Sequence, residues 1–291
     1  MFSPDDYQLL DFGDGRRLER FGSIVLDRPC PAAEGLARVS PAAWDQADAR
    51  FERTEGDEGR WIDRRPIAER WTVAHGAVQF ELKRTEFGHV GLFPEQVANW
   101  DWIAQQLADA PRLVRVLNLF AYTGGSTLAV AAAGAEVTHV DAARNVVAWG
   151  RRNAELSGLA AAPIRWIAED AAKYVGREWK RGSLYDAVIL DPPSYGHGPR
   201  GEPWQIERNL PPLLELCGRL TAGRRRFVLL TCHTPQLGTD RLREMLADAM
   251  GGADRGDVYA DPLTIRSVGG RQLPSGVVVR WSKSGKASKV D

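Results

Sequence analysis

The sequence predicts an α/β protein whose main domain is a doubly wound, mostly parallel sheet. After residue 94, short apolar stretches alternate with segments of helical periodicity, and before residue 90 short strand-like segments are separated by turn residues. Strands joined by single helices pair in parallel through right-handed crossovers, which place helices on both faces of the sheet. We therefore expect a β-rich accessory domain over residues 1–90 and an α/β domain over residues 91–291.

The accessory domain is predicted from alternating apolar and polar residues with turn residues between them. Strands are expected at residues 7–12, 23–26, 71–73 and 77–82, with turns at 13–15 and 75–76. The polar, glycine-punctuated segment 54–60 is expected to be an exposed loop.

The α/β domain is predicted from two patterns that alternate along the chain. Val97, Trp100 and Leu107 recur at helical spacing, whereas residues 113–119 form an almost continuous apolar run typical of a buried strand. In chain order we expect helix 95–108, strand 113–119, helix 126–133, strand 136–140, helix 142–156, strand 164–167, helix 171–179, strand 185–190, helix 212–220 and strand 226–231. Antiparallel strands at 258–259, 265–268 and 277–281 are expected to finish the sheet edge.

Composition limits the class of protein. The chain has 291 residues, of which 44% are hydrophobic and 26% charged, enough for one large core and a small accessory domain. No apolar run approaches a membrane span and the acidic start lacks signal-peptide features, so we expect a cytoplasmic protein with no membrane partner. The three cysteines, at positions 30, 217 and 232, are too few and scattered for a disulfide framework or a metal site.

The net charge gives no global attraction to nucleic acid, because 38 basic side chains balance 38 acidic ones. An RNA-binding protein of this composition must use local basic patches. The candidates are residues 224–226, the group Arg177, Lys180 and Arg181, and the tail residues Lys283, Lys286 and Lys289. Such runs are more often solvated charge on surface turns or at a frayed chain end.

The predicted strand ends carry residues suited to an adenosine-containing cofactor. Open α/β sheets bind ligands beyond the carboxyl ends of their strands. The loop 122–126, Tyr-Thr-Gly-Gly-Ser, has two glycines that let its backbone approach a ligand at a helix N-terminus, although an ordinary tight turn explains it as well. Asp141, about twenty residues past the glycines, suits ribose hydroxyls. Asp170 suits the adenine amine, or a cap for the helix that begins at Ala171.

A second motif, Asp191-Pro192-Pro193-Ser194-Tyr195, follows the apolar strand and suits a flat substrate. Consecutive prolines fix an extended backbone and remove two amide donors, which leaves carbonyls as acceptors for an amino-bearing base. The glycine- and proline-rich segment 196–209 predicts a substrate lid, in which Tyr195 or Trp204 stacks on a flipped-out base. An inert surface loop is the alternative.

Together these motifs resemble class I S-adenosylmethionine-dependent methyltransferases, and specifically the bacterial family of large-subunit ribosomal RNA cytosine-C5 methyltransferases. The resemblance covers roughly residues 85–281 and is carried by residues 91–96, 118–125, 140–141, 169–170, 191–195 and 231–233. It implies a Rossmann-like methyltransferase sheet, S-adenosyl-L-methionine as the cofactor and ribosomal RNA as the substrate. It leaves the oligomeric state open, with a homodimer among the options.

The resemblance also implies roles for individual residues. Around the cofactor it places Phe120, Ala121, Tyr122, Thr123, Gly124, Gly125, Ser126, Asp141, Ala142, Asp170, Ala171 and Asp191, with Phe93 and Gln96 closing over it. The substrate base is expected to contact Pro192, Pro193, Tyr195 and Trp204, and Asp191 is expected to hydrogen-bond it near N3.

Cys232 decides between two chemistries. Cytosine C5 is too weak a nucleophile to attack a sulfonium methyl unaided, so a thiolate first adds to C6. The resemblance implies that Cys232 is this nucleophile, although a buried cysteine acting as a small hydrophobe is the alternative. The sequence departs from the family pattern at His233, where serine is usual, and at Ser194, where lysine or a similar residue is usual.

Two other functions stay open. An exocyclic amine or ring nitrogen can be methylated through the Asp-Pro-Pro motif with no cysteine nucleophile. Alternatively, the chain is a cofactor-binding RNA-assembly factor that performs no chemistry. No family RNA-binding domain is recognisable in residues 1–90.

Overall fold

The computed structural model describes residues 1–54, 58–108, 110–197, 203–251 and 256–283. The chain forms two units, the first from Met1–Val97 and Thr264–Ser275 and the second from Ala98–Leu263 and Gly276–Asp291. The domain boundary expected after residue 90 stays a prediction. The first unit also includes a short segment from near the C-terminus, Thr264–Ser275.

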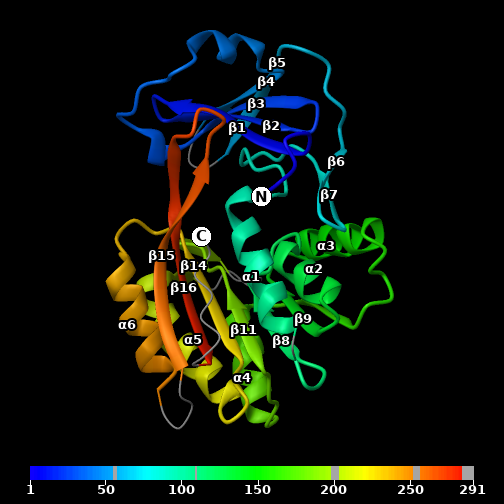
Figure 1. Ribbon diagram of the computed structural model, residues 1–291, viewed down its shortest axis with the longest axis vertical. Helices are drawn as coiled ribbons and strands as arrows, with labels where there is room; N and C mark the ends of the chain where they lie inside the picture. Colours follow the sequence, from blue (N-terminus) through cyan, green and yellow to red (C-terminus); the bar gives the residue numbers. More distant parts are fainter. Residues whose placement is uncertain (55–57, 109, 198–202, 252–255, 284–291) are drawn as a thin grey trace. The chain divides into compact units, whose positions relative to one another are not determined.

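The first unit is built on a five-stranded sheet in the order β1-β2-β3-β4-β5 (Figure 1). Its strands are β1 (Tyr7–Gly13), β2 (Arg16–Phe21), β3 (Ile24–Pro29), β4 (Ala49–Arg53) and β5 (Gly59–Asp63). Neighbours are antiparallel except β3 and β4. A separate antiparallel pair, β6 (Trp71–His75) and β7 (Val78–Leu82), confirms the hairpin expected there. Short 3₁₀ helices lie at Pro31–Ala33, Pro41–Gln46 and Pro94–Gln96.

Strand β2 was not expected, because a buried ion pair replaces part of its apolar pattern. Glu19 is fully buried, accepts hydrogen bonds from the Arg28 Nε (2.9 Å) and the Tyr7 hydroxyl (2.9 Å), and contacts Arg17. Burial acts to raise the pKa of Glu19, but the two guanidinium groups outweigh it, so the pKa is lowered. A buried carboxylate at a core-facing position interrupts the alternation of apolar and polar residues by which a strand is identified.

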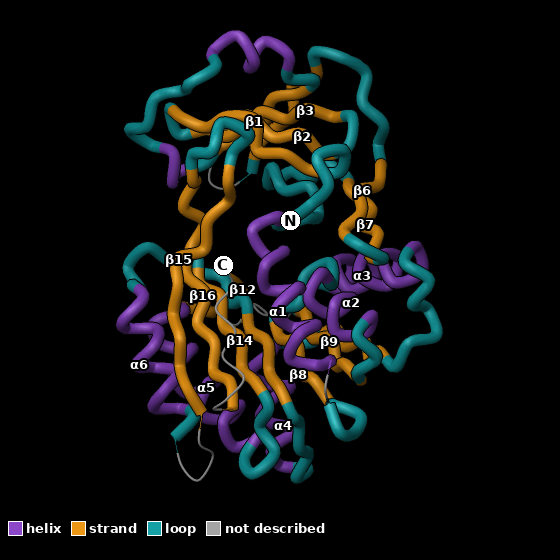
Figure 2. The backbone as a smooth tube through the Cα atoms, in the orientation of Figure 1, coloured by secondary structure: helices purple, strands orange, loops and turns teal. Residues whose placement is uncertain are grey.

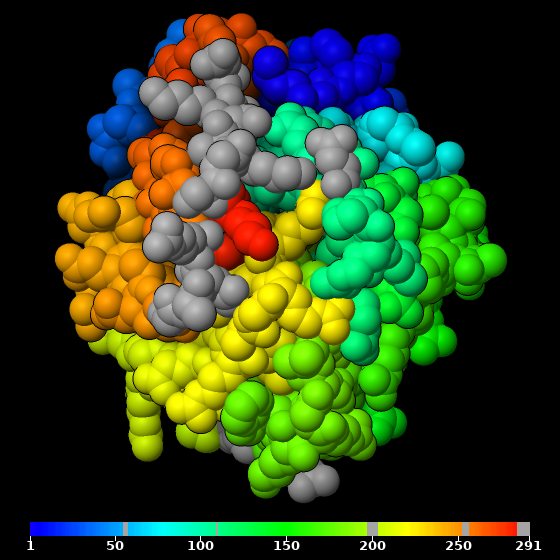
Figure 3. Space-filling model, turned by 60° about the horizontal axis from the view of Figure 1, so that its bottom comes forward, coloured from blue at the N-terminus to red at the C-terminus, as the bar shows by residue number. Residues whose placement is uncertain are grey.

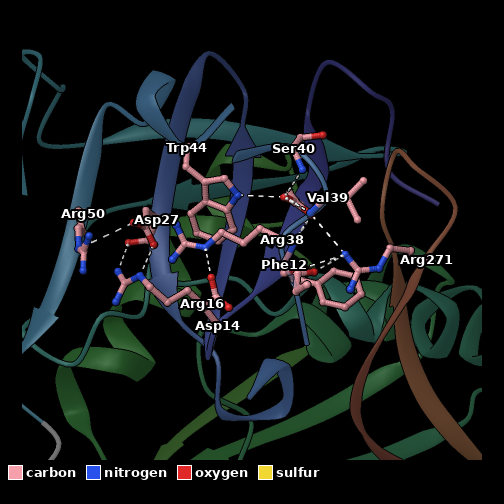
Figure 4. A network of polar contacts seen from close by, with 12 residues as sticks. Phe12, Asp14, Arg16, Asp27, Arg38, Val39, Ser40, Trp44, Arg50 and Arg271 are labelled. Atoms are coloured by element: carbon pink, nitrogen blue, oxygen red, sulfur yellow. Dashed lines mark hydrogen bonds and ion pairs between the residues drawn. The ribbon is translucent and has the colours of Figure 1, made fainter. Parts of the chain in front are cut away.

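Asp11 fixes the segment that follows β3 to the first sheet. Its carboxylate accepts hydrogen bonds from the backbone N–H of Val39 (3.1 Å) and Ser40 (2.9 Å) and from the Trp44 Nε1 (3.0 Å). Figure 4 shows Trp44 and Ser40 converging on this point, with Arg271 approaching from the C-terminal segment. Burial acts to raise the pKa of Asp11, but the hydrogen bonds outweigh it and lower the pKa. The segment Thr264–Ser275 is therefore tied to the first unit through an ion pair.

The second unit confirms the predicted α/β fold. Its seven-stranded sheet has the order β10-β9-β8-β11-β14-β16-β15 (Figure 2), parallel from β10 to β14 and antiparallel between β14 and β16. The strands are β8 (Arg115–Leu119), β9 (Glu136–Asp141), β10 (Ile164–Ala168), β11 (Ala187–Leu190), β14 (Phe227–Cys232), β15 (Gly256–Arg266) and β16 (Gln272–Lys283). The direction in which strands are added reverses after β10, so β8 lies between β9 and β11.

Six helices in the described residues accompany this sheet. They are α1 (Val97–Ala108), α2 (Gly125–Ala132), α3 (Arg144–Leu156), α4 (Ala171–Lys180), α5 (Ile206–Thr221) and α6 (Thr239–Ala249). An apolar cluster joins α4, α5 and α6 to one face of the strands, and the space-filling view shows the α4 and α5 segments on adjoining parts of the surface (Figure 3). No helix in the described ranges is long and apolar enough to cross a membrane.

Helix α5 begins at Ile206, six residues before the predicted start at 212. Pro211 and Pro212 lie inside it, and their missing N–H groups made them look like a boundary. Buried Ile206, Leu210 and Leu214 continue one apolar face through the prolines, so packing overrides the local signal. Helix α6 was also missed, although Leu242, Met245 and Leu246 recur at helical spacing.

The segment expected to be a lid contains a short hairpin. Strands β12 (Tyr195–His197) and β13 (Pro203–Gln205) pair antiparallel, and α5 follows directly. Residues 198–202, part of this lid, lie outside the described residues, as do 55–57 of the expected loop 54–60 and the tail residues Lys286 and Lys289.

The three arginines 224–226 serve the fold of the second unit. Arg225 is buried and donates to the backbone carbonyls of Met250 (2.7 Å) and Gly218 (2.9 Å), near the C-terminal ends of α6 and α5. Arg224 contacts Asp186 and Arg226 donates to the Gln106 carbonyl. In the second candidate patch, Arg177 and Arg181 pair with Glu169 and Glu178.

Acid should destabilise the second unit through Asp186. The Asp186 carboxylate is 2% exposed and accepts hydrogen bonds from Arg112, Arg224 and the Arg115 amide. Burial acts to raise its pKa, but these bonds outweigh it and lower the pKa to about 2. A carboxyl whose pKa is lower in the folded chain than in the unfolded chain stabilises the fold at pH values above its unfolded pKa. This stabilisation is lost as the pH falls through the two pKa values, here between about 4 and 2.

Asp186→Asn should therefore reduce the free energy of unfolding at pH 7 by about 2 kcal/mol and flatten its decline between about pH 4 and 2. Urea unfolding at several pH values measures both effects. The matched control is Asp240→Asn, which changes an exposed carboxylate. An Asp186→Asn profile parallel to wild type would contradict the assignment.

Candidate active site

The candidate site lies where parallel strands of the second sheet end together. Because β9, β8, β11 and β14 pair in parallel, the loops that follow them emerge at one edge. The structure thus brings together the sequence-predicted loops at residues 120–126, 141–142, 170–171, 191–195 and 232–233.

The loop after β8 has an unusual backbone. Phe120 (φ 54°) and Tyr122 (φ 49°) are left-handed although neither is glycine, and Gly124 (φ 92°) follows them. Left-handed non-glycine residues cost of order 1 kcal/mol each and persist where their surroundings hold them. The Ala121 amide donates to the Val140 carbonyl (3.1 Å) and the Tyr122 amide to Asp141 Oδ2 (2.9 Å). The loop is therefore held by the end of the neighbouring strand.

A glycine is required where this loop becomes helix α2. A β-carbon on Gly125 would lie 2.4 Å from the ring of Trp100, so no larger residue fits without displacing the indole. The close approach of α1 and α2 gives Gly125 a packing role besides its predicted contact with the cofactor, which stays a prediction.

A series of buried polar side chains lies next to the loop that follows β8, and it was not predicted from the sequence. Asn118 Nδ2 donates to the Thr127 Oγ1 (2.8 Å), which lies 2.9 Å from the His139 Nδ1. Burial, together with the charge of Arg151, lowers the pKa of His139 to about 3, so the imidazole is neutral at physiological pH. The sequence signal for these contacts was the presence of polar residues, Asn118 and His139, within otherwise apolar strands.

Asp141 holds the loop that follows β8 in place. Its two oxygens accept from the Tyr122 amide and from the Ala143 amide (3.0 Å). Burial raises the pKa of Asp141, and the backbone hydrogen bonds partly oppose this. Carboxylate oxygens have further lone pairs for ribose hydroxyls, so the structure is compatible with the predicted contact. That contact, and those of Ala142, Thr123 and Ser126, stay predictions.

Asp170 fulfils the capping role that was one of its two expected roles. Its Oδ1 accepts a hydrogen bond from the Lys173 amide (2.9 Å) at the start of α4. Contacts of Asp170 and Ala171 with adenine stay predictions, since a capping carboxylate retains a second oxygen.

Asp191 joins two residues of the β14 end. Asp191 Oδ1 accepts a hydrogen bond from the Thr231 hydroxyl (2.5 Å) and lies 3.3 Å from the His233 Nε2. The side chains of Asp191 and His233 are about one-third exposed, at 31% and 37%, so both are accessible to a substrate. The proximity of His233 to Asp191 was not predicted.

Cys232 lies in an apolar environment. Its side chain is 1% exposed and belongs to the apolar cluster that includes Leu230, Leu237 and Trp204. Burial raises the pKa of the Cys232 thiol, and the negative charge of Asp191 raises it further, against hydrogen bonds from Thr234. The thiol is therefore protonated at neutral pH in this arrangement. Its role as nucleophile stays a prediction.

Gly276 on β16 lets the backbone after β14 pass closely. A β-carbon there would lie 2.5 Å from the Cys232 carbonyl oxygen and 3.0 Å from the His233 Nδ1, and its φ of +116° itself favours glycine. A larger residue at 276 would displace the loop that carries Cys232 and His233.

The hairpin β12–β13 separates its two aromatic residues. Tyr195 is 77% exposed, whereas Trp204 is 8% exposed and its Nε1 donates to the Pro193 carbonyl (2.7 Å). From the sequence, open carbonyls were expected in the Asp191–Tyr195 motif, together with base stacking by Tyr195 or Trp204. In the structure the Trp204 Nε1 occupies the Pro193 carbonyl and the indole packs inward. Contacts of Pro192, Pro193, Tyr195 and Trp204 with a substrate stay predictions.

Phe93 and Gln96 belong to the first unit. Phe93 packs against the ring of His89, with centroids 5.3 Å apart, and Gln96 is buried at the end of the 3₁₀ helix Pro94–Gln96. Their closure over the cofactor stays a prediction.

Comparison with known proteins identifies relatives of this chain. Residues 42–250 match the family model described as S-adenosylmethionine-dependent methyltransferase. A solved S-adenosylmethionine-dependent methyltransferase from Agrobacterium tumefaciens is 38% identical, covers 96% of this chain and 91% of its own, and superposes with a TM-score of 0.90.

Curated relatives carry ribosomal RNA methyltransferase names. The large-subunit methyltransferase K/L of Shewanella frigidimarina is 30% identical over 161 residues, which cover 54% of this chain and 22% of the relative. The large-subunit methyltransferase K of Neisseria meningitidis is 24% identical over 73% of this chain and 61% of its own length. The chain thus spans only part of the length of these relatives.

Asp141→Asn should weaken binding of S-adenosylhomocysteine. The amide nitrogen that replaces one oxygen cannot accept the Ala143 or ribose hydrogen bonds, and a hydrogen bond to a charged group contributes about 1.5–3 kcal/mol. We expect a loss of affinity of about tenfold or more by isothermal titration calorimetry. Glu136→Gln, at the opposite end of β9, is the matched control. Unchanged affinity in Asp141→Asn would contradict the predicted role.

Proposed function

The chain belongs to the S-adenosylmethionine-dependent methyltransferase family, and we propose that it methylates a base of large-subunit ribosomal RNA. The names of its curated relatives support this substrate. The observation that carries the proposal is the grouping of Asp191, Thr231 and His233, one strand from the cofactor loop. The segment that begins at Asp191 also carries the exposed ring of Tyr195. A hydrogen-bonding acid and an exposed aromatic ring on one segment suit a flipped-out base. A ribosomal substrate would also make the protein cytoplasmic.

The residues of the chain would divide the work between cofactor and base. When bound, S-adenosylmethionine supplies an activated methyl group. The loop 120–126 and Asp141 would hold it, because their backbone geometry and lone pairs suit an adenosine ligand. Asp191 would accept a hydrogen bond from the amino group of the base, while its contact with Thr231 keeps the carboxylate oriented.

The first candidate acceptor is cytosine C5, with Cys232 as the nucleophile. In this reaction the thiolate adds to C6, C5 takes the methyl group, the C5 proton leaves and the carbon–sulfur bond breaks. The position of Cys232 at the end of β14, beside the strand that bears Asp191, supports it. The reaction requires the apolar cover of Cys232 to open and its proton to leave.

The second candidate acceptor is an exocyclic amine or a ring nitrogen. The burial of Cys232 and its raised pKa favour this candidate, because a nitrogen lone pair attacks a methyl group without a thiolate. The nitrogen must lose its proton when it is an amine. The Asp191 carboxylate, 3.3 Å from the His233 Nε2, supplies an acceptor near the base.

Cys232→Ser separates the two candidates. Loss of the thiolate should reduce kcat about 10³-fold or more for C5 methylation and less than about threefold for nitrogen methylation. Incorporation of labelled methyl groups into ribosomal RNA measures this. Cys217→Ser buries a hydroxyl in the same apolar cluster and is the matched control. A covalent adduct with RNA containing 5-fluorocytidine, formed by wild type and not by Cys232→Ser, would identify the thiol independently.

Mass spectrometry of ribosomal RNA nucleosides tests the substrate. A strain lacking the gene should lose one methylated nucleoside, which wild type restores and Asp191→Ala does not. If no nucleoside is lost, the ribosomal RNA proposal fails. Binding of the cofactor without methyl transfer to any total RNA preparation would favour the cofactor-binding assembly factor.

A further inference from the structure

Trp204 contacts the loops of two neighbouring strands at once. Its indole packs on the ring of Phe120, with centroids 4.9 Å apart and planes at 58°, and its Nε1 donates to the Pro193 carbonyl (2.7 Å). Phe120 begins the cofactor loop after β8, and Pro193 belongs to the loop that carries Asp191 after β11. One side chain therefore bridges the predicted cofactor and substrate loops.

The hairpin that carries Trp204 has two distinct faces. Tyr195 pairs with Gln205 and both are exposed, whereas Trp204 pairs with Gly196 on the buried face. The indole packs inward on this face, and Trp204 is only 8% exposed. Tyr195 is thus accessible to a substrate, whereas Trp204 contacts Phe120 and the Pro193 carbonyl.

A second set of contacts extends the bridge to the loop after β14. The Ser194 hydroxyl lies 2.7 Å from the Thr234 Oγ1, two residues beyond Cys232, and the Ile206 amide donates to the Ser194 carbonyl (3.1 Å). The substrate loop is therefore held on one side by Trp204 and on the other by Thr234. Neither contact was apparent from the sequence.

We propose that Trp204 is a positioning residue that couples occupancy of the cofactor site to the geometry of the Asp191-Pro192-Pro193 loop. Phe120 is left-handed and lies beside the backbone expected to contact the cofactor. A ligand that fixes this loop fixes the Phe120 ring, and through the indole it fixes the Pro193 carbonyl. The inference rests on the methyl transfer proposed above and assigns Trp204 a different role from base stacking.

Hydrogen–deuterium exchange with S-adenosylhomocysteine tests the coupling without RNA. In wild type the ligand should slow exchange in peptides containing residues 118–127 and also in those containing 194–197 and 204–210. In Trp204→Ala the slowing should persist at 118–127 and be lost at the hairpin. Persistent slowing at 118–127 in the variant demonstrates an intact cofactor site, which separates this result from misfolding and from failure of the RNA proposal.

Trp204→Phe sharpens the test, because it keeps a ring against Phe120 and removes only the donor to Pro193. It should also lose the hairpin response. Trp281→Phe, in the same apolar cluster but stacked on Arg225, should retain it. A wild-type response in Trp204→Phe, or loss of slowing at 118–127 in either Trp204 variant, would overturn the proposal.

Kinetics on ribosomal RNA provide a second readout. A residue that positions the substrate loop acts on kcat, so Trp204→Phe should reduce kcat by about tenfold while the KM for S-adenosylmethionine changes by less than about twofold. A rise in KM alone, with kcat unchanged, would assign Trp204 to cofactor binding and overturn the coupling role.

Discussion

The register of the parallel strands is the constraint on which the candidate site depends. Leu119 pairs with Val140 on one side and with Leu190 on the other, and Leu190 pairs with Leu230. The residues that follow these positions therefore lie at the same level of the sheet edge. These residues are Phe120, Asp141, Asp191 and Thr231, and the first and last are more than a hundred positions apart in the sequence. A shift of one strand by one residue would separate them.

Polar groups at this edge are satisfied chiefly by one another. Asp141 accepts from the backbone of the β8 loop, Asp191 accepts from Thr231, and the Pro193 carbonyl accepts from Trp204. The first two contacts join segments from different strands, and the third joins the loop after β11 to the hairpin that follows it. Such cross-linked loops hold a functional geometry more firmly than isolated ones, because no loop can move without breaking a bond to a neighbour.

The sequence was sufficient for the fold of the second unit because its strands are apolar and its helices periodic. It was insufficient where tertiary contacts decide the conformation. Strand β2 holds the buried Glu19, and α5 runs through Pro211 and Pro212 because its apolar face continues beyond them. For the site, the strand ends identified the loops. The inward direction of the Trp204 side chain goes with its contacts to Phe120 and to the Pro193 carbonyl, which no local pattern predicts.

The chain crosses between its two units at residues 97/98, 263/264 and 275/276, so neither unit is one uninterrupted piece of the gene. The segment Thr264–Ser275 bridges to β1 through Leu9 and Ser267 and contacts Asp11 through Arg271. Removing the first 97 codons would therefore leave a twelve-residue segment without the neighbours it pairs with. This architecture resists modular exchange: recombination that transplants either unit must carry both of its pieces, so the two units are expected to be inherited together.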